Sequence, residues 1–101
     1  MRMLLIVFRN SLEDEVRMLL KGLDVKAYTE LPKVAGIGET GTAFGSFEWP
    51  DYNSLILVAL TKGKADQVLK GLKTFQIEQS SQQPRGKIPL RVFVLPCLQV
   101  V

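Results

Sequence analysis

The side chains that most enzymes use for catalysis are scarce in this sequence. It contains no histidine and a single cysteine, Cys97. These counts exclude a histidine-based triad, a cysteine–histidine nucleophile pair, a histidine-ligated metal and a zinc site built from cysteines. Arg9 and Asn10 form an adjacent pair that would suit an anion hydrolase, but they equally suit a strand end followed by a helix cap. We therefore expect no catalytic residue, no metal site and a protein that is not an enzyme.

Two glycine-containing segments are the candidates for binding an anion. Gly36-Ile-Gly38 with Gly41 gives the spacing G-x-G-x-x-G, which leaves backbone N–H groups accessible, but no helix pattern follows as a dinucleotide fingerprint requires. Arg85-Gly-Lys87 sets two cations around a glycine in a polar connector. This segment is either an anion-binding loop or a solvated one.

Positive charge is concentrated in the C-terminal part of the chain. Residues 62–101 carry seven Lys or Arg against two Asp or Glu, whereas the whole chain has a net charge of +3. Such a balance favours an anionic ligand, with a solvated helix face as the alternative. The spacing of Phe44-Gly-Ser-Phe47 resembles an RNA-binding strand, but the strand expected at residues 54–60 has no aromatic side chain on which a base would stack. We therefore expect no nucleic-acid partner.

Half of the eight aromatic residues lie within nine positions, in the stretch that follows the glycines. They either anchor a long loop on the protein body or a neighbouring subunit, or form a recognition patch for a partner. The four residues are Phe44, Phe47, Trp49 and Tyr52.

The hydrophobic pattern predicts four strands and two helices. The first helix is expected to start at the caps Asn10 and Ser11 and to stop near Gly22, and the second to start at Thr61. Apolar stripes recur at Leu12, Val16, Leu19, Leu20 and Leu23, and again at Ala65, Val68, Leu69, Leu72 and Phe75. The strands are expected at residues 3–8, 25–34, 54–60 and 90–95, with a connector at residues 76–89.

This order of elements predicts an α+β, ferredoxin-like βαββαβ fold in one domain, residues 1–101, with two helices on one face of a four-stranded antiparallel sheet. Residues 3–8, 55–60 and 92–95 are apolar at both alternating sets of positions, so both faces of the sheet require burial. A chain of 101 residues has no third layer to supply. We therefore expect a closed homo-oligomer.

The N-terminal apolar run is too short to cross a membrane, because Arg9 and Asn10 end it after six residues. One cysteine allows no internal disulfide, so nothing in the sequence requires an oxidising compartment. The expected location is the cytoplasm, without membrane insertion.

Three stretches, together with the element order, resemble the PII-like superfamily of trimeric signalling proteins. Val34-Ala-Gly-Ile-Gly38 is similar to the strand end before the family's T-loop, and Leu55-Ile-Leu-Val-Ala-Leu60 with Ala65-Asp-Gln-Val-Leu69 to its third strand and second helix. Val92-Phe-Val-Leu-Pro96 is similar to its last strand. In Ser80-Ser-Gln-Gln-Pro-Arg-Gly-Lys87 only the final Gly-Lys matches the family's phosphate-binding B-loop.

The resemblance implies a homotrimer that binds a small anionic effector, such as an adenine nucleotide or bicarbonate, at clefts between subunits and carries no permanent cofactor. The loop at residues 36–52 would act on a protein partner, for example a membrane transporter or an enzyme. The ligand-binding residues would be Gly36, Ile37, Gly38, Arg85, Gly86 and Lys87. The alternative is an effector-independent scaffold trimer, either similar to CutA or associated with a transporter.

Overall fold

The computed structural model describes residues 1–36, 52–81 and 88–101, and these residues contain the expected order of elements. The strands are β1 (Arg2–Arg9), β2 (Thr29–Val34), β3 (Asn53–Leu60) and β4 (Leu90–Pro96), and the helices are α1 (Glu13–Gly22) and α2 (Lys62–Ser81). A short 3-10 turn, η1 (Asn10–Leu12), joins β1 to α1.

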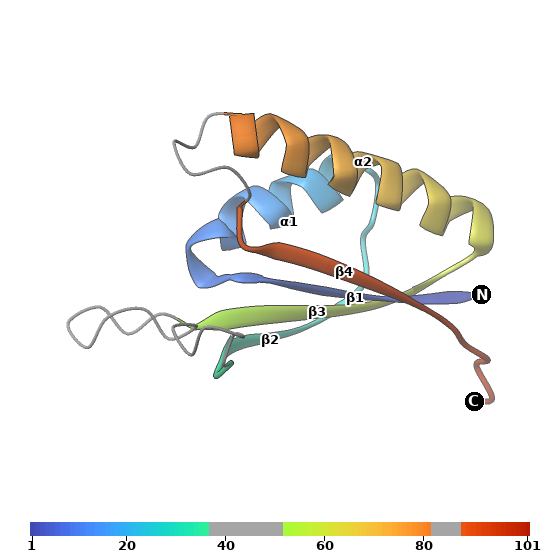
Figure 1. The fold of residues 1–101 in the computed structure, drawn as a ribbon. Coiled ribbons are helices and arrows are strands. Elements are labelled where there is room, and N and C mark those ends of the chain that lie inside the picture. Colours follow the sequence, from blue (N-terminus) through green and yellow to red (C-terminus); the bar gives the residue numbers. More distant parts are fainter. Residues whose placement is uncertain (37–51, 82–87) are drawn as a thin grey trace.

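The four strands form one antiparallel sheet in the order β2-β3-β1-β4. Both helices lie on the same face of this sheet (Figure 1). The ferredoxin-like α+β fold is therefore confirmed. Since β1 is central, each of its ends lies between an end of β3 and an end of β4. The segment that leads into β3 and the segment that leads into β4 therefore both reach the C-terminal end of β1.

The core lies between the sheet and the helices. Leu4, Ile6 and Phe8 of β1 are buried, whereas their neighbours in the strand are only half-buried. Both predicted helical stripes face this core, with Leu12, Leu19, Leu23 and Leu69 packed at its margin. Its other buried apolar residues are Val16, Leu20, Val25, Ile56, Val58, Ala65, Val68, Leu72, Phe75, Ile88 and Leu90.

The other face of the sheet is apolar, and the described residues do not cover it. The strand register places Leu5 of β1 between Leu57 and Phe93, and Met3 between Ala59 and Leu95. Phe93 and Leu95 are 54% and 51% exposed. The prediction that the strands are apolar on both faces is confirmed, and one of these faces is left open in the single chain.

The expected N-terminal caps of the first helix are wrong. Asn10 and Ser11 lie in the 3-10 turn, and α1 begins after Leu12 without a side-chain cap. The backbone N–H of Asn10 donates instead to the carbonyl of Tyr52 at 2.8 Å. This bond to the end of the loop holds Asn10 outside the α-helix.

The left-handed residue that ends α1 is Asp24, at φ 60°, rather than Gly22, which is the last helical residue. Asp24 N–H donates to the Lys21 carbonyl at 3.0 Å, and Val25 N–H donates to the Leu20 carbonyl at 2.9 Å. This is a Schellman motif, whose usual residue at the left-handed position is glycine. Buried Leu20 and Val25 supply its hydrophobic contact.

Replacing Asp24 by glycine is expected to stabilise the protein by about 0.5–1 kcal/mol. Glycine removes the left-handed strain at the position, and the gain is reduced by the greater freedom of glycine in the unfolded chain. The Asp24–Lys26 ion pair that the change removes is exposed at both ends and contributes little. Urea unfolding of D24G beside wild type measures the difference, and a loss of stability would contradict the assignment.

The second helix begins as expected and ends later. Lys64 N–H donates to Thr61 Oγ1 at 3.3 Å, which confirms Thr61 as the cap. The expected connector at residues 76–89 is helical as far as Ser81. Gln76 Nε2 donates to the Leu90 carbonyl at 2.9 Å and ties this added segment to β4. Tertiary contact, rather than an apolar stripe, therefore stabilises the last turns.

The second strand starts at Thr29 and not at residue 25, because Val25 closes the end of α1 and is buried beneath it. Between Leu31 and Val34 the pairing with β3 shifts, and Lys33 is left-handed at φ 54°. Pro32 lies within this irregularity, as is typical of an edge strand. Among the described residues, no helix is long and apolar enough to span a membrane.

Candidate functional site

The C-terminal end of β1 joins the two segments from which the expected ligand site would be built. Arg9 pairs with Asn53 at the start of β3, and Asn10 N–H donates to the Tyr52 carbonyl. On the other side, Arg9 N–H donates to the Pro89 carbonyl at 3.1 Å. The loop that returns at Tyr52 and the connector that ends at Pro89 therefore converge on two consecutive residues of one strand.

The outgoing end of the loop reaches the same place. Val34 of β2 pairs with Asn53, and Gly36 follows it so closely that a Cβ on Gly36 would lie 2.6 Å from Asn53 Nδ2. Real Cβ atoms do not show such a contact, so a side chain at position 36 would require Asn53 or the backbone at Gly36 to shift. Gly36 and Tyr52 thus stand at the two ends of the loop, next to the end of β1.

Arg9 is the cation that the described residues place at this junction. It is half-buried, and its Nε atom is fully enclosed. In the sequence, Arg9 stands out only as half of an Arg–Asn pair and as a strand end. The signal that would have identified it is its position at the end of the central strand, where ferredoxin-like topology brings two loops together.

Most of the predicted site residues lie outside the described residues. Gly36 is described, whereas Ile37, Gly38, Arg85, Gly86 and Lys87 are not. Of the aromatic patch, Tyr52 is described and is 40% exposed, whereas Phe44, Phe47 and Trp49 lie outside. The structure therefore brings together residues that flank these segments, Gly36, Tyr52 and Pro89, and the roles of the individual site residues stay predictions.

A polar cluster beside the junction ties α1 to β2 and β3. Arg17 of α1 donates from Nε and Nη2 to the two carboxylate oxygens of Glu30 on β2, at 3.0 and 2.6 Å. Buried Ser54 of β3 donates from Oγ to Glu13 Oε1 at 3.0 Å, and Glu13 also lies 3.5 Å from Arg17 Nη2. The cluster fixes the strands at either side of the loop to one helix.

The hydrogen bond from Arg17 holds the pKa of Glu30 below its usual value, and partial desolvation of the carboxylate opposes this shift. The same bond raises the pKa of Arg17, so the pair is ionised throughout the physiological range.

The stability of the protein is expected to fall in acid through Glu30. A carboxylate whose pKa is lowered by folding contributes stability above its unfolded pKa, near 4.5, and loses that contribution as the pH falls through the lower folded value. Glu30→Gln removes the contribution at all pH values. Urea unfolding at pH 7 and pH 3 measures both proteins. The difference in free energy of unfolding between wild type and Glu30→Gln is expected to be smaller at pH 3 than at pH 7. An unchanged difference would contradict the role of the Arg17–Glu30 pair.

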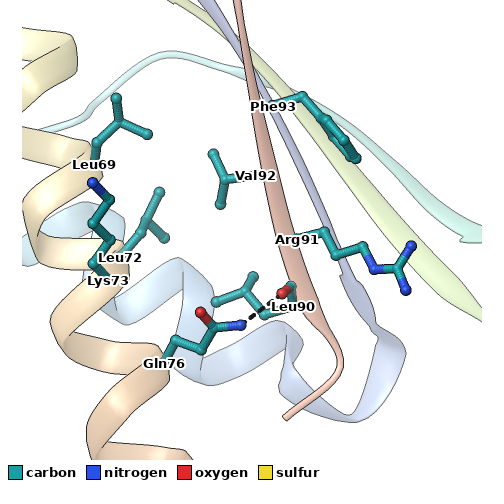
Figure 2. A pocket seen from close by; sticks show the side chains of 8 residues that line it. All are labelled: Leu69, Leu72, Lys73, Gln76, Leu90, Arg91, Val92 and Phe93. Carbon is teal, nitrogen blue, oxygen red and sulfur yellow. Dashed lines mark hydrogen bonds between the residues drawn. The ribbon is translucent and has the colours of Figure 1, made fainter. Parts of the chain in front are cut away.

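A groove of about 450 Å³ lies between α2 and β4, and Figure 2 shows its lining side chains. Leu69, Leu72, Leu90 and Val92 make it largely apolar, and Lys73 stands beside them on the helix. Arg91 and Phe93 project to the other side of β4 (Figure 2). This groove therefore suits apolar side chains better than a phosphate, and the junction at Arg9 remains the better candidate for an anion.

No group of three or more metal-ligating side chains occurs among the residues described.

The protein-family model for the nitrogen regulatory protein P-II matches residues 1–101. The chain belongs to the P-II family. The resemblance inferred from its sequence motifs is thus confirmed, and this family consists of regulatory proteins.

Solved structures agree with this membership at the level of the fold. CPII, a nitrogen regulatory PII-like protein from Thiomonas intermedia K12 bound to ADP, AMP and bicarbonate, is similar at TM-score 0.66 and 23% identity, over 93% of this P-II chain and 82% of CPII. The apo form of CPII is similar at TM-score 0.63 and 21% identity, over 93% of this chain and 85% of that CPII chain. A PII-like signaling protein from Thermus thermophilus is similar at TM-score 0.56 and 22% identity, over 93% of this chain and 85% of the Thermus chain. No curated protein matches the chain.

Proposed function

We propose that this P-II chain is a non-enzymatic, cytoplasmic regulator that binds an adenine nucleotide or bicarbonate at clefts between its subunits. The observation that carries the proposal is that the carbonyls of Tyr52 and Pro89, which lie just after the loop at residues 37–51 and the connector at residues 82–87, accept hydrogen bonds from the backbone N–H groups of Asn10 and Arg9. The occurrence of ADP, AMP and bicarbonate in structures of CPII, which has the same fold, supports this choice of effectors.

The residues at this junction suit an anion. In the proposal, Gly36, Ile37 and Gly38 offer backbone N–H groups, and Arg85, Gly86 and Lys87 supply charge and a close backbone approach. Arg9 adds a cation that is already held at the meeting point. A bound effector would order the loop, whose aromatic residues Phe44, Phe47, Trp49 and Tyr52 would contact a protein partner such as a transporter or an enzyme.

The assembly in this proposal is a homotrimer with the open sheet face of each copy buried against the others. Its apolar side chains come from all four strands, and monomers rarely leave such a face exposed. Closed rotational symmetry buries one face of every copy equally. The face is formed by Met3, Leu5, Val7, Leu31, Leu55, Leu57, Ala59, Phe93 and Leu95.

Thermal unfolding with ADP, AMP, ATP and bicarbonate tests the effector. At about one hundred times its dissociation constant, a ligand that binds only the folded state stabilises it by about 2.7 kcal/mol. We expect at least one of the four to raise the melting temperature of wild type. The double variant R85A/K87A is expected to lose most of this rise.

The matched control is K62A/K70A, which removes two exposed cations from α2, away from the junction. It is expected to keep the wild-type response. If no effector stabilises the intact assembly, the effector-independent scaffold becomes the better account. If both double variants respond alike, the connector has no specific role in binding.

A further inference from the structure

Ser54 of β3 is a polar residue in an apolar part of the core. Among the residues described, it is the one polar side chain that is buried. Ile56 and Val58, which follow it on the same face of β3, are buried and apolar. A buried hydroxyl costs free energy unless it is hydrogen-bonded, so packing alone would favour an apolar side chain at this position. The hydroxyl of Ser54 therefore has a role other than filling space.

The backbone pairing between β2 and β3 is interrupted opposite Ser54. The pairs on its two sides are Leu31–Leu55 and Val34–Asn53. Two residues of β2, Pro32 and Lys33, therefore lie opposite Ser54 alone. A bulge of this kind bends its strand and disrupts the ladder of hydrogen bonds locally. Side-chain contacts must therefore help to fix the course of β2 toward Gly36.

The side chains of β2 give it little apolar anchorage. All of them are exposed except Glu30 and Val34, which are half-buried. The two bonds that Arg17 of α1 donates to Glu30, at 3.0 and 2.6 Å, are charge-assisted and bidentate, and such a pair fixes the orientation of both side chains. A polar contact therefore sets how β2 lies on the helix.

Glu13 connects this pair to Ser54. Its Oε1 atom accepts a hydrogen bond from the Ser54 hydroxyl at 3.0 Å and lies 3.5 Å from Nη2 of Arg17. A continuous polar path thus runs from β3 through α1 to β2, at the point where the ladder between the two strands is interrupted. We call its four residues, Glu13, Arg17, Glu30 and Ser54, the stem cluster.

The stem cluster lies next to the junction at Arg9. Asn53 directly precedes Ser54 in β3 and pairs with Arg9. Its Nδ2 atom is the one that a Cβ on Gly36 would approach to 2.6 Å. A displacement of β2 against β3 would therefore move Gly36 relative to Arg9 and change the shape of the junction.

We propose that the stem cluster positions the effector site, because it holds β2 and β3 so that Gly36 and Asn53 face the end of β1 at a fixed separation. This inference rests on the proposed binding of an effector at the junction. The four side chains are positioning residues, which do not contact the effector and act through the strand or helix that carries them.

Ser54→Ala tests this role, because it removes one hydroxyl and adds no atoms. Its affinity for the effector that stabilises wild type is expected to fall about tenfold in calorimetric titration. In the effector-free, isotope-labelled protein, the NMR signals of the Gly36 and Asn10 amides are expected to shift. Glu13→Gln keeps an oxygen that accepts from Ser54, so it is expected to bind the effector more tightly than Glu13→Ala does.

The double variant E13A/S54A is expected to bind no more weakly than E13A, because two residues that act as one unit have non-additive effects. A further tenfold loss in the double variant would contradict the shared path between them.

The matched control is Val68→Ala, which truncates a buried side chain of α2, a helix that contributes no residue to the stem cluster. Urea unfolding is expected to show a loss of stability at least as large as in Ser54→Ala. Its effector affinity and its Gly36 and Asn10 amide signals are expected to match those of wild type. An equal loss of affinity in Val68→Ala would make stability alone responsible and overturn the proposal.

Two further outcomes separate this inference from the proposed function. If wild type binds an effector and Ser54→Ala binds it equally well, the positioning role is wrong and the proposed function stands. If wild type binds none of the effectors, the proposed function is wrong and the positioning role falls with it.

Discussion

Replacing Leu57 by aspartate is expected to convert a trimer into folded monomers. Leu57 lies in the middle of the open face, opposite Leu5 and Thr29. Burying a leucine stabilises an interface by about 2 kcal/mol, and a trimer with three such sites would lose about 6 kcal/mol. This loss raises its dissociation constant by about four orders of magnitude. Size-exclusion chromatography with light scattering measures the mass of each species.

The control for this experiment is Lys70→Asp, which places the same side chain on the exposed surface of α2. It is expected to stay trimeric. Circular dichroism of L57D is expected to retain the helical signal, because the core between the sheet and the helices is on the other side of β3. A wild-type monomer, or a trimeric L57D, would contradict the burial of this face.

Replacing Gly36 by valine is expected to weaken effector binding about tenfold or more while the fold persists. The first side-chain atom would lie 2.6 Å from Asn53 Nδ2, so either Asn53 or the outgoing end of the loop must move. A shift of this size at a binding site typically costs tenfold or more in affinity. Calorimetric titration with the effector that stabilises wild type measures the loss.

Gly63→Ala provides the comparison, since a Cβ at Gly63 meets no atom within 4 Å. Gly63 is in the first turn of α2, where alanine is the better helix former, by up to about 1 kcal/mol. This variant is expected to bind as wild type does and to be slightly more stable. Normal binding by G36V would remove Gly36 from the site.

The parts of the fold that the sequence predicted are those with strong hydrophobic patterns. The two helical stripes lie where their periodicity placed them, and the strands at residues 3–8 and 54–60 lie where their continuous apolar runs placed them. The errors occur where tertiary bonds decide the local structure. Asn10 bonds to Tyr52 instead of capping a helix, and Gln76 bonds to Leu90 and keeps the last turns of α2 helical. A single residue gives no local sign of such partners.

The candidate site was predictable in its segments and less so in its residues. Glycine spacing and the Gly-Lys pair pointed to the two loops, and the structure places Tyr52 and Pro89, which follow these loops, at the same end of β1. Arg9 and the cluster of Glu13, Arg17 and Glu30 were missed as a site, because their residues lie on three different elements and show no motif. The contacts of Glu13, Arg17 and Glu30 depend on how α1 packs against β2 and β3.

A crystal structure of the protein grown with ADP and bicarbonate tests the central claim most directly. The account predicts a trimer in which the open faces of the sheets are buried together. It also predicts density for the ligand between two copies, in contact with residues 36–38 and 85–87 and next to Arg9. Ligand bound away from this junction, or sheets whose open faces remain exposed to solvent, would contradict it.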